Sequence, residues 1–473
     1  MTDIARLGVV EASALLARRG VSATELAEAL LSRIREVDGV HSHEGDPASI
    51  NAWVRIYEED ALASAARADD RLSESGVRRE GAAPALTGVP IGLKDLYGVA
   101  GKPLTASSRL LQDVPAEDCD VWRRLSVAGM VLLGHLHTHE FAAGGTTDQV
   151  GSPWGLERSA GGSSGGSAAA LASRTTPAAT GTDTAGSLRI PSACCGTSAL
   201  KPTRGLVSNA GIVPLAWSLD HAGPMARSLA DCALLLEAMA GPDRRRAETS
   251  LHAKPVRGGS SLAGACVAVS PRLASSGIDA DVAAGLDRAL DACRRLGAEL
   301  VEPPGPGLPD AVGDDFVDVL TTEMLVYHRR FDAHRDGYRP SLREWVETGE
   351  RRALSAEEYI AARGRRFQTT GAWADWLAEH RLDAVLEPTI PVVAPLRGDG
   401  YDHAGTDYAL ISLTHLWDWT GFPVAALPAG IGRAGLPVGV SLVGAAGSDW
   451  AVLALGEALQ DELGVPEPPA LAA

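Results

Sequence analysis

A run of glycines and serines at residues 161–167 (GGSSGGS) is the feature that most constrains the fold of this chain. Such a run is often a flexible linker between two domains. Here, however, the helix-forming pattern SAAALASR follows at once. A glycine-rich stretch that opens a helix suits a close approach of the backbone to a ligand. A phosphate-binding loop is a rival interpretation, but the Lys-Ser/Thr ending of that motif is missing. We therefore favour a place inside a folded domain over a linker.

Strand-like and helix-like segments alternate around this run, from about residue 120 to residue 240. AGMVLLGHL (128–136) has the pattern of a buried strand, and TTPAATGTDTAGSLRIP (175–191) that of a strand entering a sharp turn. Further on, LDAVLEPTIPVVAP (382–395) is expected to return as a strand, while residues 320–380 are expected to be helical. This alternation predicts an α/β sheet covered by helices.

Composition and charge narrow the class of protein. The chain has 473 residues, of which 45% are hydrophobic and 22% charged, the balance of a soluble globular protein. Its net charge of −17 argues against nucleic acid or anionic lipid as the main partner. We find neither a signal peptide nor an apolar stretch long enough to span a membrane, and we expect a cytoplasmic protein. The six cysteines show no zinc-binding spacing and are expected to be reduced.

Lys94 stands in the apolar segment PIGLKDLYG, an unusual setting for a lysine. Burial would lower its pKa and let the neutral amine act as a base. A surface lysine at a strand end is the alternative.

In the segment GTDTAGSLR (181–189), a run of mostly small residues directly precedes Ser187. A strand-to-turn junction of this kind can aim several backbone N–H groups at one point, as an oxyanion hole requires. Asp183 and Arg189 carry opposite charges and could clamp the turn, although an incidental surface pair is an equal alternative.

A histidine base for Ser187 is not evident. The GxSxG motif of α/β-hydrolases is absent around Ser187, and no histidine–aspartate pairing can be identified. The pattern HLHTH (135–139) resembles a metal cluster, but histidines of the core or surface near a strand end are the better interpretation. We expect no metal.

Taken together, these segments resemble the amidase signature family. The matching segments are GLKD (92–95), GGSSGGS (161–167), GTDTAGSLRIP (181–191), LKPTRG (200–205), SLDHAGPMAR (218–227), LEPT (386–389), GFP (421–423) and LPVG (436–439). The resemblance covers most of the chain and is loose only across residues 241–380. It implies an α/β fold with a large mixed sheet core covered by helices on both faces.

The resemblance also implies a catalytic triad. Ser187 would attack the carbonyl carbon, Ser163 on a cis peptide bond would relay the proton, and Lys94 would accept it. Hydrolysis of the acyl-enzyme would complete the reaction without metal or cofactor. The implied oxyanion hole consists of the backbone N–H groups of Thr184, Ala185, Gly186 and Ser187. The implied supporting residues are Ser164, Asp183 and Arg189.

Several positions depart from the family pattern. Ala185 replaces a common glycine, so its backbone angles must suit an ordinary residue. Ser152 stands where asparagine is usual, and His135 and His137 stand where lysine and asparagine are frequent. These departures leave the triad intact and put the substrate class in doubt.

The substrate is the least determined feature. We expect a small-molecule aryl or alkyl amide, or a carbamate (urethane) or ester, with no nucleic acid and no membrane as partner. A homodimer is an expectation from the family. The alternative is a glutamine-amidotransferase-type subunit that needs a partner, against which the missing C-terminal Tyr-Asp-Gly signature and the acidic charge argue. A non-enzymatic binding module is a third interpretation, and the intact lysine and serines argue against it.

Aromatic residues near the matched motifs are candidates for the substrate pocket, although each suits core packing as well. The candidate substrate-binding residues are Tyr97, Gly144, Trp217, Trp417 and Trp419.

We expect one domain over residues 1–473. Its expected parts are a helical N-terminal region (1–75), a signature core (85–240), a variable helical region (241–380) and a C-terminal return to the sheet (381–473).

Overall fold

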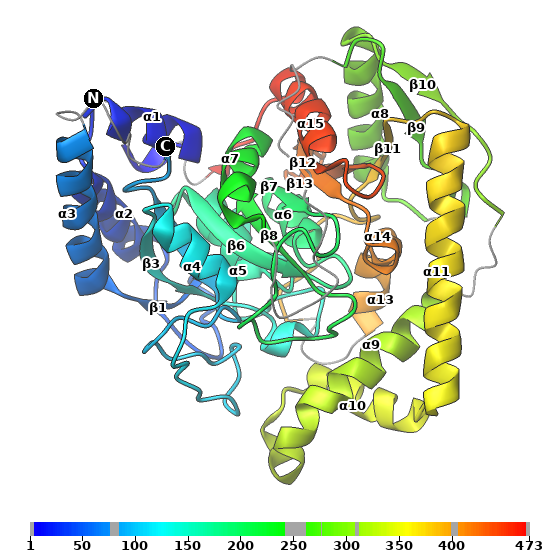
Figure 1. Cartoon of the computed structure of the whole chain (residues 1–473), viewed down its shortest axis with the longest axis horizontal. Helices are drawn as coiled ribbons and strands as arrows, with labels where there is room; N and C mark the ends of the chain where they lie inside the picture. The colour runs from blue at the N-terminus through cyan, green and yellow to red at the C-terminus, as the bar shows by residue number, and fades with distance from the viewer. Residues whose placement is uncertain are drawn as a thin grey trace.

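One mixed sheet of eleven strands forms the centre of the computed structural model, which describes residues 4–75, 85–241, 262–275, 277–307, 312–398 and 405–469 (Figure 1). The strands of the sheet, in spatial order, are β1 (Trp53–Ile56), β3 (Val131–Leu136), β2 (Pro90–Lys94), β6 (Ala178–Asp183), β8 (His221–Ala226), β7 (Ser198–Lys201), β12 (Val424–Ile431), β13 (Pro437–Val443), β11 (Ala384–Pro388), β9 (Cys266–Val269) and β10 (Glu299–Val301). A separate pair consists of β4 (Gly151–Ser152) and β5 (Gly155–Ser159). The predicted large mixed sheet is confirmed.

The direction of the strands brings the motifs together. β2 runs parallel to both of its neighbours, β3 and β6, whereas β8 pairs antiparallel with β6. Every residue of β2 and β6 is buried, as expected for central parallel strands. Because parallel strands end at the same edge of a sheet, Lys94 at the end of β2 and Asp183 at the end of β6 lie on one side.

Helices cover the sheet on both faces. The helices are α1 (Val9–Ala17), α2 (Ala23–Val37), α3 (Glu58–Ser75), α4 (Asp120–Val127), α5 (Gly165–Ala172), α6 (Arg189–Cys195), α7 (Leu229–Met239), α8 (Ala280–Arg295), α9 (Val312–His328), α10 (Pro340–Arg352), α11 (Ala356–Glu379), α13 (Gly405–Ile411), α14 (His415–Thr420) and α15 (Asp449–Leu463). On β13, Val438 lies against Gly285 of α8, and the adjacent Gly439 lies against Ala193 of α6. Successive residues of a strand point to opposite faces, so α8 and α6 lie on opposite faces.

The first two helices of the chain form an N-terminal pair. They are α1 and α2, which are separated around Arg19 and Gly20. Ser22 caps α2, because its hydroxyl accepts from the Glu25 N–H while the Glu25 carboxylate accepts from the Ser22 N–H. In Figure 1, α1–α3 and α9–α11 lie on opposite flanks of the molecule.

The segment 382–395 differs from the expected strand, because β11 ends at Pro388 and a second proline follows at Pro391. Proline has no N–H to donate to a neighbouring strand, so the ladder stops there. The division into one domain with four parts stays a prediction, and residues 242–261 of the variable region lie outside the described residues.

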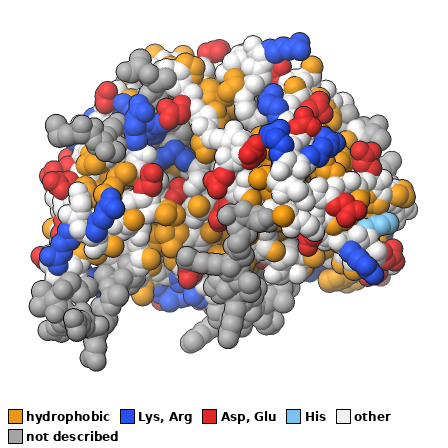
Figure 2. All heavy atoms as spheres, turned by 90° about the horizontal axis from the view of Figure 1, so that it is seen from above, with side chains coloured by type: hydrophobic (Ala, Val, Ile, Leu, Met, Phe, Trp, Pro, Cys, Tyr) orange, Lys and Arg blue, Asp and Glu red, His pale blue; other side chains and the backbone are white. Residues whose placement is uncertain are grey.

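The surface seen in Figure 2 mixes acidic, basic and hydrophobic side chains. None of the helices in the described ranges is long and apolar enough to cross a membrane.

The glycine run allows a close approach of α5 to the sheet, which gives a test of stability. A Cβ atom at Gly166 would lie 2.5 Å from the His137 nitrogen and 2.6 Å from the Ala52 oxygen. We expect Gly166→Ala to lower the free energy of unfolding by about 1–3 kcal/mol through overpacking. Urea unfolding of the purified variant measures this change.

Gly364→Ala is the matched control, since a Cβ at this position in α11 meets nothing within 4 Å. It should leave stability unchanged or raise it by up to about 1 kcal/mol. Equal stability changes in the two variants would contradict the close-approach argument.

Candidate active site

Three segments meet where β2 and β6 end. Lys94 is the last residue of β2, Ser163 and Ser164 precede α5, and Ser187 lies in the turn between β6 and α6. The sheet therefore brings together residues that are far apart in the sequence.

The Lys94 amine is completely buried among three hydroxyl groups. Its Nζ atom lies 2.8 Å from Ser163 Oγ, 2.9 Å from Ser164 Oγ and 2.8 Å from Thr182 Oγ1. Thr182 was not singled out in the sequence, although it lies inside the matched segment 181–191. A neutral amine has two N–H donors and one lone pair, so one of these hydroxyls can donate to the nitrogen.

Burial lowers the pKa of Lys94 well below its ordinary value, although the negative charges of Asp183 and Asp220 oppose the shift. No carboxylate of the described ranges lies within ion-pair distance of the amine. The neutral form, which a base requires, is therefore favoured.

The loop that carries Ser163 is fixed through its backbone. The Gly162–Ser163 peptide bond is cis. The Ser163 carbonyl accepts hydrogen bonds from the His139 N–H at 3.0 Å and the Thr147 hydroxyl at 3.1 Å. Only glycine fits at position 162, because a Cβ atom there would lie 2.0 Å from the Thr146 carbonyl oxygen. The Ser163 hydroxyl is thereby held beside the amine.

The Ser187 hydroxyl makes no hydrogen bond to any described residue, and the side chain is almost buried at the wall of a pocket. The implied relay through Ser163 is thus formed on its lysine side, where Ser163 contacts Lys94, whereas no hydrogen bond joins Ser163 to Ser187 in the described part of the chain. A hydroxyl that is not engaged elsewhere can turn toward a substrate carbonyl or toward Ser163.

The implied oxyanion hole needs one correction. The Gly186 N–H donates to Asp183 Oδ1 at 2.6 Å, so this group is already engaged. Among the described residues, the N–H groups of Ala185 and Ser187 have no acceptor. Ala185 has no positive φ, whereas Gly186 has a φ of 137°, which favours glycine. The alanine is therefore accommodated at an ordinary position of the turn.

Asp183 and Arg189 form a buried ion pair that clamps this turn. The guanidinium donates to both Asp183 oxygens, from Nε and Nη2, each at 2.9 Å. Its Nη1 also donates to the Thr414 carbonyl at 3.0 Å and its Nη2 to Asp418 Oδ2 at 2.6 Å. The Thr414 hydroxyl in turn donates to the Ala185 carbonyl. The clamp, rather than an incidental surface pair, ties the turn to α14.

A pocket of about 420 Å³ opens beside Ser187. Its lining is mostly apolar and includes Gly144, Leu320, Met324, Trp345, Asp407 and Ile411. Of the expected pocket residues, only Gly144 lies in this lining. Leu320, Met324 and Trp345 belong to α9 and α10, where no motif marked them.

The other expected pocket residues lie elsewhere. The Tyr97 hydroxyl donates to the Gly181 carbonyl at 2.6 Å inside the core. Trp417 and Trp419 are buried in hydrophobic clusters, and Trp217 is 36% exposed. None of these four side chains is in the described lining of the pocket beside Ser187, and their part in substrate binding stays a prediction.

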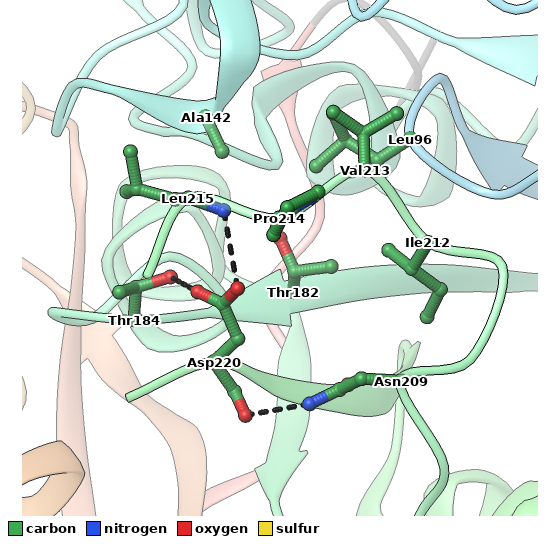
Figure 3. Close-up of a pocket in the computed structure, with 10 residues that line it drawn as sticks. All are labelled: Leu96, Ala142, Thr182, Thr184, Asn209, Ile212, Val213, Pro214, Leu215 and Asp220. Carbon is green, nitrogen blue, oxygen red and sulfur yellow. Dashed lines mark hydrogen bonds between the residues drawn. The ribbon is translucent and has the colours of Figure 1, made fainter. Parts of the chain in front are cut away.

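A second pocket adjoins the first, since Ala142 and Leu215 line both (Figure 3). Its polar wall includes Asp220, which accepts from the Thr184 hydroxyl at 2.6 Å and from the Leu215 N–H at 3.1 Å. Burial raises the pKa of Asp220 to about 7. Thr182, the partner of the Lys94 amine, also lines this pocket.

The histidines of HLHTH are core residues with separate partners. His135 contacts the Tyr57 hydroxyl, His137 the Ser107 hydroxyl and His139 the Thr146 carbonyl, at 2.7, 3.1 and 3.0 Å. Burial lowers the pKa of His137 and that of His139 to about 3. No group of three metal-ligating side chains occurs in the described ranges.

The chain belongs to the amidase family, whose model, described as Amidase, matches residues 25–453. It is therefore an enzyme of the class that hydrolyses amide C–N bonds, and the buried lysine and two serines at the ends of β2 and β6 suit that class. The predicted resemblance is therefore confirmed.

Known proteins resemble the chain over nearly its whole length. A glutamyl-tRNA(Gln) amidotransferase subunit of Anaeromyxobacter dehalogenans (strain 2CP-C) is 34% identical, covering 99% of this chain and 98% of the relative. A crystal structure described as an amidase is 31% identical with a TM-score of 0.82, covering 97% of this chain and 100% of the other. The structure of the corresponding glutamyl-tRNA(Gln) amidotransferase subunit from Thermotoga maritima is 27% identical with a TM-score of 0.80, covering 99% and 98%.

These relatives correct two expectations. The main expectation for the substrate, a small aryl or alkyl amide or a carbamate or ester, is wrong, because the curated relatives are amidotransferase subunits. The expectation for the partners was a small-molecule substrate, a homodimer and no nucleic acid. The same finding corrects it, since the relatives are named as subunits of a glutamyl-tRNA(Gln) amidotransferase. Net charge describes a whole surface and does not by itself identify the partners of a protein.

The buried histidines predict acid sensitivity. The unfolded chain protonates His137 and His139 below their ordinary pKa of 6.5, whereas the folded chain keeps them neutral down to about 3. The unfolded state thus binds more protons, and stability falls as pH falls below 6.5. Each histidine should lower the free energy of unfolding by about 2 kcal/mol between pH 7 and pH 5. Thermal unfolding across this range measures the loss.

His137→Gln should lose part of this pH dependence. His380→Gln, at an exposed position, is the control and should keep the dependence of the wild type. A wild-type response to acid in both variants would contradict the role of His137 in this pH dependence.

Proposed function

We propose that this chain is the amide-hydrolysing subunit of an amidotransferase-type assembly and that its substrate is a primary carboxamide of the glutamine type. The proposal is supported by 34% identity to a glutamyl-tRNA(Gln) amidotransferase subunit, with coverage of 98% of that relative.

The proposed reaction begins with attack of Ser187 Oγ on the carboxamide carbon. Its proton passes to Ser163, and Ser163 passes its own proton to the neutral Lys94 amine. The carbonyl π electrons move onto the oxygen, and the resulting oxyanion accepts from the N–H groups of Ala185 and Ser187. When the tetrahedral intermediate collapses, the C–N bond breaks, and a proton returned through Ser163 completes ammonia.

Water then hydrolyses the acyl-enzyme. Lys94 accepts a proton from water through Ser163, hydroxide adds to the ester carbon, and the bond to Ser187 breaks with return of the proton to Oγ. The carboxylic acid leaves, and the amine is neutral again. In an amidotransferase-type assembly, the released ammonia would serve a partner protein.

One observation carries the proposed amide hydrolysis. The buried amine of Lys94 lies 2.8 Å from the Ser163 hydroxyl, and no described cation or carboxylate is in direct contact with this amine. Burial of a lysine amine lowers the stability of the fold, because the amine loses its hydration. A role in proton transfer accounts for an amine in this environment.

Replacement of the lysine tests the base. We expect Lys94→Ala to lower kcat by at least about 100-fold, the usual size of a general-base contribution. In the wild type, the rate should fall as pH falls toward the pKa of Lys94, because a protonated amine has no lone pair. Ammonia release from glutamine across a range of pH measures both effects. A near-normal rate for Lys94→Ala at every pH would exclude the role.

Ser187→Ala tests the nucleophile and the substrate together. Intact-protein mass spectrometry after incubation with glutamine should show a glutamyl adduct on the wild type and none on the variant. The variant should retain the thermal stability of the wild type, because the Ser187 hydroxyl bonds to no described residue. The proposed substrate is wrong if the wild type shows neither adduct nor ammonia release with glutamine.

A further inference from the structure

The pocket beside Ser187 holds a single charged side chain among its described lining residues. The lining combines apolar residues such as Leu320, Met324 and Ile411 with the carboxyl group of Asp407. Asp407 lies in α13 and is 2% exposed. An acidic group in an otherwise apolar wall is costly unless something compensates for its charge.

Neutral donors hold the Asp407 carboxyl group but do not compensate for its charge. Oδ1 accepts from the Gly145 N–H at 2.6 Å, and Oδ2 accepts from the Trp345 indole at 3.0 Å. Within the described ranges, no lysine, arginine or histidine pairs with this carboxyl group. Each oxygen keeps a second acceptor site, since a carboxylate offers about four.

The surroundings of Asp407 add to the negative charge. Burial raises the pKa of Asp407 to about 7, and the negative charges of Asp148 and Glu344 contribute to the rise. The carboxyl group in the pocket is therefore set to take up either a proton or a cation. Asp407 and both of its donors, Gly145 and Trp345, line the pocket, so a cation bound in the pocket would lie beside this carboxyl group.

We propose that Asp407 is a recognition site for an ammonium group of the substrate, seated in the same pocket as the nucleophile Ser187. This inference rests on the proposed function and deepens it, because glutamine carries an α-ammonium group beside its side-chain amide. The described pocket lining contains no cationic side chain that would receive a carboxylate. The ammonium end, rather than the carboxylate end, is therefore the part that the pocket selects.

A structural role makes a different prediction. If Asp407 only fastens α13 to Gly145 and Trp345, its loss should weaken the binding of every substrate by the same factor. If it receives an ammonium group, its loss should weaken the binding of ammonium-bearing ligands alone. Four amides that differ only in their charged groups separate these cases: glutamine, 4-aminobutanamide (ammonium only), glutaramate (carboxylate only) and butanamide (neither).

Binding to Ser187→Ala protein, measured by calorimetry, tests the inference without turnover. We expect each ammonium-bearing amide to bind about 10- to 100-fold more tightly than its partner without the ammonium, the range for a hydrogen bond to a charged group. Asp407→Asn in the same background should abolish that ratio and leave butanamide binding unchanged. Glu347→Gln is the matched control, since this acidic residue is exposed and does not line the pocket, and it should keep the ratio.

Two outcomes would overturn the inference. One is that, in the Ser187→Ala protein, glutamine binds no more tightly than glutaramate and 4-aminobutanamide no more tightly than butanamide. The other is that Asp407→Asn weakens the binding of all four amides by the same factor. If the variant fails to fold, the pH dependence of the Ser187→Ala protein decides. The preference for ammonium-bearing amides should then fade as pH falls below about 7, where Asp407 becomes protonated, and a constant preference would overturn the inference.

The failure of the proposed function would look different. In that case, wild-type protein would not hydrolyse glutamine, while 4-aminobutanamide would still bind more tightly than butanamide. Recognition of the ammonium group would stand, and the natural substrate would be another cationic amide.

Discussion

The removal of one lysine amine from water is the constraint on which the rest of this structure depends. Lys94 is completely buried, and three hydroxyls from two different segments meet its Nζ atom. A buried amine is tolerated only where its polar partners are fixed. The parallel pairing of β2 with β6 and the close packing of the glycine run supply this fixation, so the sheet and the site impose conditions on each other.

The second fixed element is the turn that carries Ser187. Asp183 accepts hydrogen bonds from two backbone N–H groups of the turn as well as from Arg189. One buried carboxylate therefore shapes the turn and pairs with Arg189, and Arg189 in turn connects the end of β6 to α14. Because the Gly186 N–H already donates to Asp183, the N–H groups left for an oxyanion are those of Ala185 and Ser187.

The alternation of strand-like and helix-like segments allowed the sheet class to be predicted, whereas Lys94, Ser163 and Ser187 were joined into one site only by the resemblance to the amidase signature family. Thr182 could not be distinguished from other small residues, since its contact with Lys94 depends on strand pairing. The prediction for the tryptophans was open for a physical reason, since a large apolar side chain near a motif suits the core as readily as a pocket. Trp345 and Asp407 were missed because α9, α10 and α13 carry no motif, and only the folded chain brings them to Ser187.

The two halves of the site come from different parts of the chain. The lysine and serines lie within residues 94–187, whereas the pocket side chains of α9, α10 and α13 lie within residues 320–411. Mutation can therefore change the helices that line the pocket while the proposed catalytic residues are inherited unchanged. Two related enzymes can therefore share the same reacting groups and still act on different substrates. The pocket residues of α9, α10 and α13 are then the part of the sequence that differs with the substrate.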